Sequence, residues 1–97
     1  MRVLRMKATA EIQVVPIGAG VSVREHVKRA HEILASSGLT VALHAFGTNV
    51  EGDLDAILGA VRRIHEELHA SGIVRLTTNV KIGTRTDKEP TLAGKLF

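Results

Sequence analysis

The chain has 97 residues, a formal net charge of +3 at pH 7, no cysteine and only two aromatic residues, Phe46 and Phe97. This composition suits one globular domain with an aliphatic core, and the absence of cysteine excludes disulfides and favours a reducing, cytoplasmic setting. The basic residues are scattered, aromatic stacking surfaces are missing, and no apolar run approaches the ~20 residues of a transmembrane helix, so neither nucleic acid nor a membrane is an expected partner.

Two amphipathic helices are predicted between strands. Apolar residues alternate with polar ones in the expected strands and recur at spacings of three and four in the expected helices. Ser22, with Glu25 three residues later, predicts a capping box at the first helix, and Asp53 predicts the N-cap of the second. Gly38 and Gly72 are expected to end these helices. In chain order we expect a strand over 8–16, a helix over 23–37, strands over 40–46 and 48–51, a helix over 54–71 and a strand over 74–82.

This β-α-β-β-α-β order predicts an α+β, ferredoxin-like fold, with four antiparallel strands and two helices on one face. We expect a single domain over residues 1–97, with 1–6 as a disordered extension and 84–97 as a polar tail that contains a short helical turn. The other face of the sheet then has no cover within the chain, and it carries apolar as well as polar side chains. A second subunit, a ligand or both are expected to cover it. Alternation assigns to this face Glu11, Gln13, Val15, His44, Phe46, Thr77, Asn79 and Lys81.

The central turn over 47–53 is the most informative segment, because two glycines, a hydroxyl, an amide and two carboxylates meet there between plain core elements. Phe46 is expected to form an apolar wall for a flat heterocycle. Thr48, Gln13 and Asn79, expected on or near one face, can form hydrogen bonds with a ring edge of alternating polarity. Glu11 or Glu51 can complement a cationic ligand. The candidate ligand-binding residues are Glu11, Gln13, Phe46, Gly47, Thr48, Asn49, Glu51 and Asn79.

Two other motifs are weaker. Residues 65–69 match the H-E-x-x-H pattern of zinc proteases, but His69 is the last histidine of the chain, so no downstream histidine can serve as third ligand. A solvated helix face explains the match better, and we expect no metal site. The glycine-rich segment over 17–22 could bind an anion at a helix start, but it lacks a complete phosphate-binding motif. A strand-to-helix turn is the simpler interpretation.

Three segments together resemble the signature segments of the small thiamine-binding protein family. They are residues 10–18, 47–53 and 80–88, and the similarity extends over nearly the whole chain from Met6. The resemblance implies a ferredoxin-like fold, dimers formed by sheet packing and tetramers built from those dimers. It also implies binding of thiamine or its hydroxymethylpyrimidine part without catalysis and without a cofactor, with Thr48 and its neighbours at the ligand pocket.

Two alternatives stay open at this stage. One is an oligomerisation or regulatory module that binds a different small ligand. The other is a small hydrolase similar to the acylphosphatases, which share the expected fold and use a loop arginine with an asparagine. Arg24 and Asn49 could take these roles, but the phosphate-binding loop of those enzymes is not matched between the first strand and the first helix.

Overall fold

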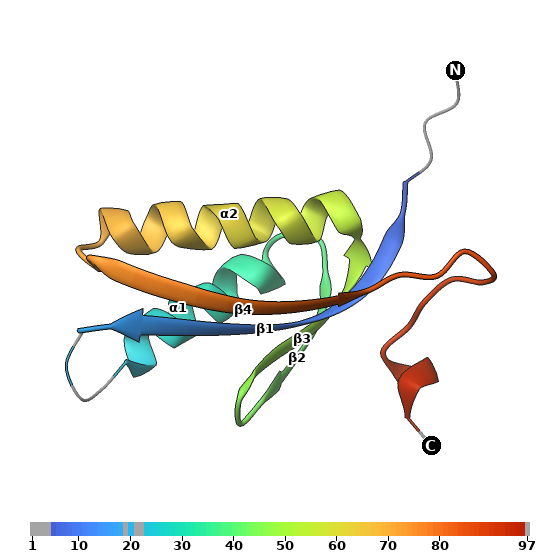
Figure 1. The fold of residues 1–97 in the computed structure, drawn as a ribbon, viewed down its shortest axis with the longest axis horizontal. Coiled ribbons are helices and arrows are strands. Elements are labelled where there is room, and N and C mark those ends of the chain that lie inside the picture. Colours follow the sequence, from blue (N-terminus) through green and yellow to red (C-terminus); the bar gives the residue numbers. More distant parts are fainter. Residues whose placement is uncertain (1–4, 19, 21–22, 97) are drawn as a thin grey trace.

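The structure is a computed structural model that describes residues 5–18, 20 and 23–96. Its element order confirms the predicted β-α-β-β-α-β arrangement and the α+β, ferredoxin-like fold (Figure 1). The elements are β1 (Lys7–Ile17), α1 (Arg24–Ala35), β2 (Thr40–His44), β3 (Gly47–Asp53), α2 (Leu54–Ala70), β4 (Arg75–Gly83) and a 3-10 turn, η1 (Ala93–Lys95).

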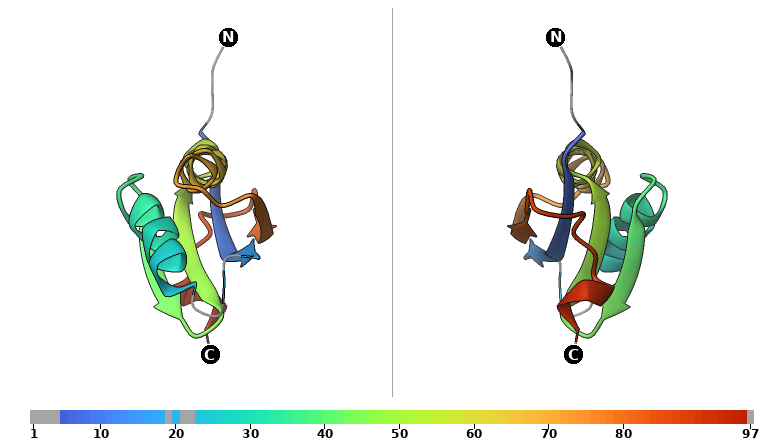
Figure 2. Two further views of the ribbon diagram at one scale, coloured as in Figure 1. Left: turned by 90° about the vertical axis from the view of Figure 1, so that its left-hand side faces the viewer. Right: turned by 90° about the vertical axis from the view of Figure 1, so that its right-hand side faces the viewer.

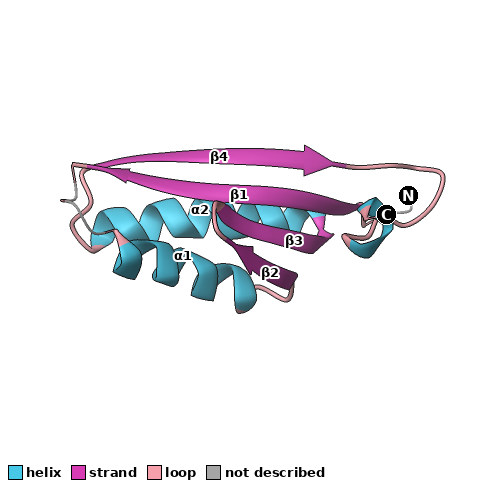
Figure 3. Ribbon diagram, turned by 90° about the horizontal axis from the view of Figure 1, so that it is seen from below, coloured by secondary structure: helices cyan, strands magenta, loops and turns pink. Residues whose placement is uncertain are grey.

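The four strands form one antiparallel sheet in the order β2-β3-β1-β4. β1 is therefore central, while β2 and β4 are the edge strands. Figures 2 and 3 show α1 and α2 running along the sheet as a helical layer. We call the sheet surface turned away from the helices the open face. Among the described residues, no helix is long and apolar enough to cross a membrane.

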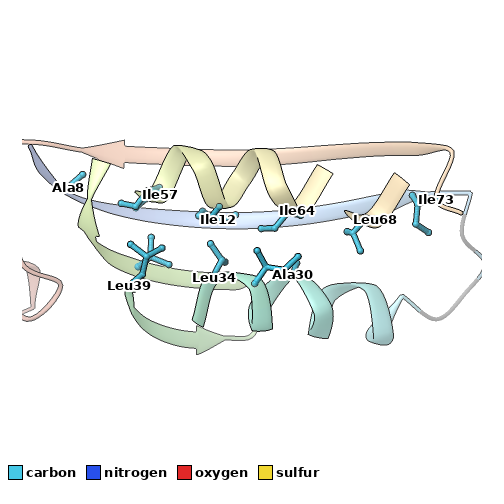
Figure 4. Packing of buried hydrophobic residues seen from close by; sticks show 13 residues of the cluster. Ala8, Ile12, Ala30, Leu34, Leu39, Ile57, Ile64, Leu68 and Ile73 are labelled. Carbon is cyan, nitrogen blue, oxygen red and sulfur yellow. The ribbon is translucent and has the colours of Figure 1, made fainter. Parts of the chain in front are cut away.

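An aliphatic core fills the space between the sheet and the two helices (Figure 4). Alternation along β1 directs Ala8, Ala10 and Ile12 into it, and the small alanines leave room for the helices. Spacings of three and four predict an apolar stripe along α2, and its members Ile57, Ile64 and Leu68 are buried as predicted. The fully buried large side chains are Ile12, Ile33, Leu34, Val50, Ile57, Ile64 and Leu68.

Alternation along the strand predicts that Val74, Leu76, Thr78, Val80 and Ile82 point toward the core, but this face of β4 is less buried than predicted. Leu76 and Thr78 are half-buried, but Val80 and Ile82 each stay 37% exposed, because β4 is an edge strand with a neighbour on one side only. Val74 was expected to begin the inward set, yet β4 starts at Arg75 and Val74 is exposed. The prediction for Val74 is wrong because the turn after α2 extends past it.

Two further boundaries differ from the prediction. β2 ends at His44, so Phe46 lies in a two-residue turn rather than on a strand face, and the expected place of Phe46 on the open face is wrong. α1 begins at Arg24 with Val23 in the N-cap position and no side-chain cap. The predicted cap residue, Ser22, lies outside the described residues.

The N-terminus of α2 is held in place by Arg5 and Met6, which precede β1, and by Lys7, the first residue of β1. Asp53 is the N-cap residue as predicted, but its side chain makes no capping hydrogen bond. It instead pairs with Lys7 at 2.8 Å and with Arg5 at 3.1 Å, and the Lys7 ammonium is the main reason that the pKa of this carboxyl lies below its usual value. The Leu54 N–H donates to the Met6 carbonyl at 2.7 Å. Arg5 and Met6, which we expected to belong to an extension, therefore contact the helix start.

The C-terminal segment turns back over one end of the sheet. The Leu92 N–H donates to Glu51 Oε1 at 2.9 Å, and Pro90 is buried. Thr9, on the open face of β1, is buried as well. The tail thus covers part of the open face and leaves the rest, toward the β2–β3 hairpin, uncovered by the described chain.

Gly59 offers a stabilising substitution in the middle of α2. A Cβ atom built at this position has no neighbour within 4 Å. We expect Gly59→Ala to raise the free energy of unfolding by about 0.5–1 kcal/mol, since alanine reduces the freedom of the unfolded chain and favours helix. Urea unfolding followed by circular dichroism measures this change, and a loss of stability would contradict the helix packing described here.

Glu67 of α2 forms an ion pair with Arg29 of α1, and this contact between the helices predicts that stability depends on pH. Glu67 Oε1 accepts from Arg29 of α1 at 2.5 Å and Oε2 from Arg63 at 2.5 Å. The hydrogen bond with Arg29 is the main cause that lowers the Glu67 pKa below its ordinary value of 4.5. A lowered folded-state pKa stabilises the fold above pH 4.5, and this contribution is lost as the pH falls through the folded-state pKa.

We therefore expect Glu67→Gln to lower the urea midpoint at pH 7 and to differ less from the wild type at pH 3. Glu66→Gln, a change at the neighbouring exposed carboxylate, is the matched control and should leave the midpoint nearly unchanged at both values. If Glu67→Gln lowered the urea midpoint equally at pH 7 and pH 3, the ion pairs of Glu67 would not be the cause of the loss.

Candidate functional site

A cavity of about 180 Å³ lies between α1 and the β2–β3 hairpin, on the helix side of the sheet. β1 forms its floor, α1 forms one wall and the hairpin forms the other. Its lining is mostly apolar, as is usual for small-molecule sites. The apolar side chains around it are Ile12, Val14, Val27, Ala30, Leu34, Leu43 and Phe46.

One polar pair lies at this cavity. Thr48 of β3 is 4% exposed, and its Oγ1 lies 3.3 Å from Nδ1 of His31 on α1. Thr48 pairs with Ile12 of β1, whose side chain is in the core, so the Thr48 side chain also points to the helices. No aspartate or glutamate is among the described residues that line the cavity. These residues can therefore form hydrogen bonds but offer no negative charge.

The hairpin tip stands at the mouth of the cavity. Phe46 is 76% exposed and Leu43 is 63% exposed, although both are large apolar side chains. The Phe46 N–H donates to His44 Nδ1 at 3.2 Å, which fixes the turn. At Gly47 a Cβ atom would stand 2.6 Å from the Ile12 carbonyl oxygen, so the hairpin can lie this close to β1 only with glycine.

The open face brings together a second group of candidate residues. Asn79 Nδ2 donates to Gln13 Oε1 at 2.9 Å, which confirms that β1 and β4 place these two side chains next to each other. Glu11 lies 3.3 Å from His44 Nε2. Asn49 is the register partner of Glu11 on β3, so its side chain is on the same face.

The predicted site residues are therefore divided by the sheet. Thr48 was expected on or near the face of Gln13 and Asn79, and this expectation is wrong. Thr48 is in register with Ile12, which precedes Gln13, and successive residues of a strand point to opposite faces. Phe46, Gly47 and Thr48 lie at the cavity, whereas the side chains of Glu11, Gln13, Asn49, Glu51 and Asn79 belong to the open face.

A larger hollow of about 540 Å³ lies on the open face beneath the tail. Ala42, Asn49, Glu11 and Lys81 form one row across all four strands at its floor. The tail supplies the wall through residues 92–96. Glu51, a candidate charge complement, instead holds this tail by accepting the Leu92 N–H.

His31 is the cavity residue that the sequence analysis missed. Its signal was present, because position 31 lies four residues after Val27 and three before Leu34, within the apolar stripe of α1. A polar residue in such a stripe needs a partner when it is buried. The partner, Thr48, is 17 residues away, and no local pattern identifies it.

The H-E-x-x-H residues have other partners. His65 Nε2 lies 2.8 Å from Thr78 Oγ1, and His69 Nδ1 donates to the Ile73 carbonyl at 2.7 Å. Glu67 lies in the ion pairs with Arg29 and Arg63. Within the described part of the chain, no group of three or more His, Cys, Asp or Glu side chains could hold a metal ion.

The positions of Arg24 and Asn49 do not support the acylphosphatase-like alternative. Arg24 opens α1 on the helix side of the sheet, whereas the side chain of Asn49 lies on the open face. The structure therefore does not bring these two residues together on one face of the sheet.

The fold and the cavity together define a ferredoxin-like protein with a small, largely apolar cavity between α1 and the β2–β3 hairpin. The model of a family described as thiamine-binding protein matches residues 10–97, and the chain belongs to this family. The resemblance seen in the sequence is thereby confirmed.

Relatives and solved structures agree with this membership. The chain is 43% identical over 95 residues to the UPF0045 protein sll0230 of Synechocystis, which covers 98% of this chain and 78% of that protein. The crystal structure of MJ1052 from Methanocaldococcus jannaschii has a TM-score of 0.86 at 39% identity, with 93% of this chain and 92% of that chain covered. TM0486 of Thermotoga maritima, described as a candidate for thiamine biosynthesis or salvage, has a TM-score of 0.81 at 26% identity, with 93% and 95% covered.

Proposed function

We propose that this protein binds the pyrimidine part of thiamine, or free hydroxymethylpyrimidine, in the cavity between α1 and the β2–β3 hairpin, and that it does so without turnover in the cytoplasm. The observation that carries the proposal is the cavity itself, with apolar walls, one His–Thr pair and an apolar mouth. A flat ring with a few polar edge atoms matches such a lining. Membership of the thiamine-binding protein family gives independent support.

The size and charge of the cavity favour the pyrimidine over the whole vitamin. A volume of about 180 Å³ is below the ~300–1,000 Å³ of sites for drug-sized ligands, so it suits a single ring. A buried cation needs a charge partner, and none of the lining residues that the structure describes carries a carboxylate. The thiazolium of thiamine would therefore stay outside, beside Phe46 and Leu43.

Calorimetric titration with hydroxymethylpyrimidine and with thiamine tests the proposal. We expect saturable binding of both at one ligand per chain. Phe46→Ala should weaken binding about three- to tenfold, since an aromatic contact contributes about 0.5–1.5 kcal/mol. Asn79→Ala, on the opposite face, is the matched control and should change affinity less than about twofold.

Two results would contradict this assignment. Absence of binding heat with either compound at millimolar concentration would rule out both compounds as ligands. Binding that is lost in Asn79→Ala but kept in Phe46→Ala would move the site to the hollow on the open face, where Gln13, Glu11 and Asn49 remain candidates.

The proposal includes a second copy of the chain on the open face. Val15 and Ile17 are partly exposed there among polar side chains, and the family resemblance implies dimers formed by sheet packing and tetramers of those dimers. Light scattering of the purified protein should give at least twice the chain mass. Val15→Glu should shift the assembly toward monomer, and a wild-type monomer at high concentration would refute the second copy.

A further inference from the structure

We propose that His31 is the residue that recognises the amine of the bound ring, and that Thr48 positions His31 instead of touching the ligand. This inference rests on the proposed function and deepens it. It assigns the recognition of one ligand group to one nitrogen atom, Nε2 of His31. It also changes the role of Thr48, which sequence reasoning had placed in direct contact with the ligand.

The other polar residues at the cavity have their side chains elsewhere. Gln13 lines the cavity, but its Oε1 accepts from Asn79 on the open face. His44 also lines it, but its Nδ1 accepts the Phe46 N–H and its Nε2 faces Glu11. Within the described lining, the polar side chains that remain on the helix side are His31 and Thr48.

Of this pair, only His31 has an atom free for a ligand. Thr48 is almost fully buried and its hydroxyl lies against His31 Nδ1. His31 is half-buried, and its Nε2 has no hydrogen-bond partner among the described residues yet is not one of their buried, unpartnered atoms. Nε2 is therefore accessible, and it belongs to a residue that lines the cavity.

The chemistry of imidazole sets what Nε2 can do. A neutral ring carries one N–H donor and one lone-pair acceptor. When Nδ1–H donates to the Thr48 hydroxyl, Nε2 is the acceptor. An amine enclosed in the cavity needs an acceptor, because a buried unpaired donor loses its hydrogen bonds with water. Since no carboxylate or free side-chain amide belongs to the described lining of the cavity, His31 Nε2 is the side-chain acceptor available among these residues.

A ligand–protein cycle tests the contact. The two probes are hydroxymethylpyrimidine and the same ring with hydrogen in place of the amine. We expect the wild type to bind hydroxymethylpyrimidine about five- to tenfold more tightly than the probe without the amine, which is the range of one hydrogen bond. For His31→Phe, which keeps a ring but no nitrogen, we expect the two probes to bind equally within about twofold.

The role of Thr48 is tested in both backgrounds. Thr48→Val should reduce the difference in affinity between the two probes in the wild-type background. Thr48→Ser, which keeps the hydroxyl, should retain this difference. In the His31→Phe background Thr48→Val should have no further effect, because a residue that acts through His31 has nothing left to position. The second His–Thr pair of this chain, His65 and Thr78, supplies matched controls, since His65→Phe and Thr78→Val should change neither affinity.

The outcomes separate the two proposals. If the wild type binds neither probe, the proposed function and this inference both fail. If it binds both probes equally well, the ligand assignment stands and recognition of the amine is refuted without any variant. If Thr48→Val weakens binding as strongly in His31→Phe as in the wild type, Thr48 touches the ligand directly and the positioning role is wrong.

Discussion

Replacing Ile64 with alanine is expected to lower the free energy of unfolding by about 2–5 kcal/mol, the usual range for a large aliphatic side chain lost from a core. Ile64 is fully buried in the middle of α2 and belongs to the cluster that joins the helices to the sheet. Phe46, the one phenylalanine among the described residues, is exposed, so no large aromatic side chain in that part of the chain supplements the aliphatic core. Urea unfolding measures the change.

Leu58 provides the control on the same helix. Its side chain is 49% exposed, so Leu58→Ala removes far less buried surface and should lower the free energy of unfolding by less than about 1 kcal/mol. Similar losses for the two variants would mean that the exposed side of α2 is covered by another molecule in solution. The unfolding of the Leu58 variant thus also reports on contacts of α2 outside the chain.

The fold could be predicted from the sequence because its signals are local. Alternation along β1 and the spacing of Ile57, Ile64 and Leu68 identify a strand and a helix without knowledge of any distant residue. Errors arose where an element ends. The sequence around Phe46 continues the alternation of β2, although the chain already turns at that point to bring Gly47 against β1.

The residue types of the candidate site could be predicted, but the face of the sheet that each side chain occupies could not, because that face depends on the strand register. The residue types at the central turn pointed to the hairpin that borders the cavity. Which face Thr48 occupies, however, depends on its pairing with Ile12, and a shift of one residue would exchange the two faces. The same holds for Glu51, whose partner is a backbone N–H at Leu92, 41 residues later. Contacts of this kind leave no periodic pattern in the sequence.

The division of the candidate residues by the sheet has a consequence for function. Under the proposed function, a ligand in the cavity would meet the helix side of β1 and β3, while the open face would stay available for another subunit. Binding and assembly would then use opposite faces of one small domain. The β2–β3 hairpin connects the two, since Thr48 faces the cavity and the adjacent Asn49 faces the open side.

The hairpin is the feature whose disruption should affect the site most. Gly47→Ala places a Cβ atom 2.6 Å from the Ile12 carbonyl oxygen, a backbone atom that cannot rotate away. We expect the hairpin to move off β1, with a loss of about 1–3 kcal/mol in the free energy of unfolding, as for other overpacked positions. Because Phe46 and Thr48 flank this residue, hydroxymethylpyrimidine affinity should fall at least tenfold under the proposed function.

Gly83 is the matched control for this change, because it is also a strand glycine next to β1 but lies at the far end of the sheet. A Cβ atom there would meet Lys95 Nζ and Thr9 Oγ1 at 3.6 Å, an ordinary contact distance. Gly83→Ala should therefore keep both stability and affinity close to those of the wild type. If Gly47→Ala instead keeps full affinity while losing stability, the cavity formed by the hairpin is not the binding site. If it loses neither, the close approach of the hairpin to β1 is not required by the fold.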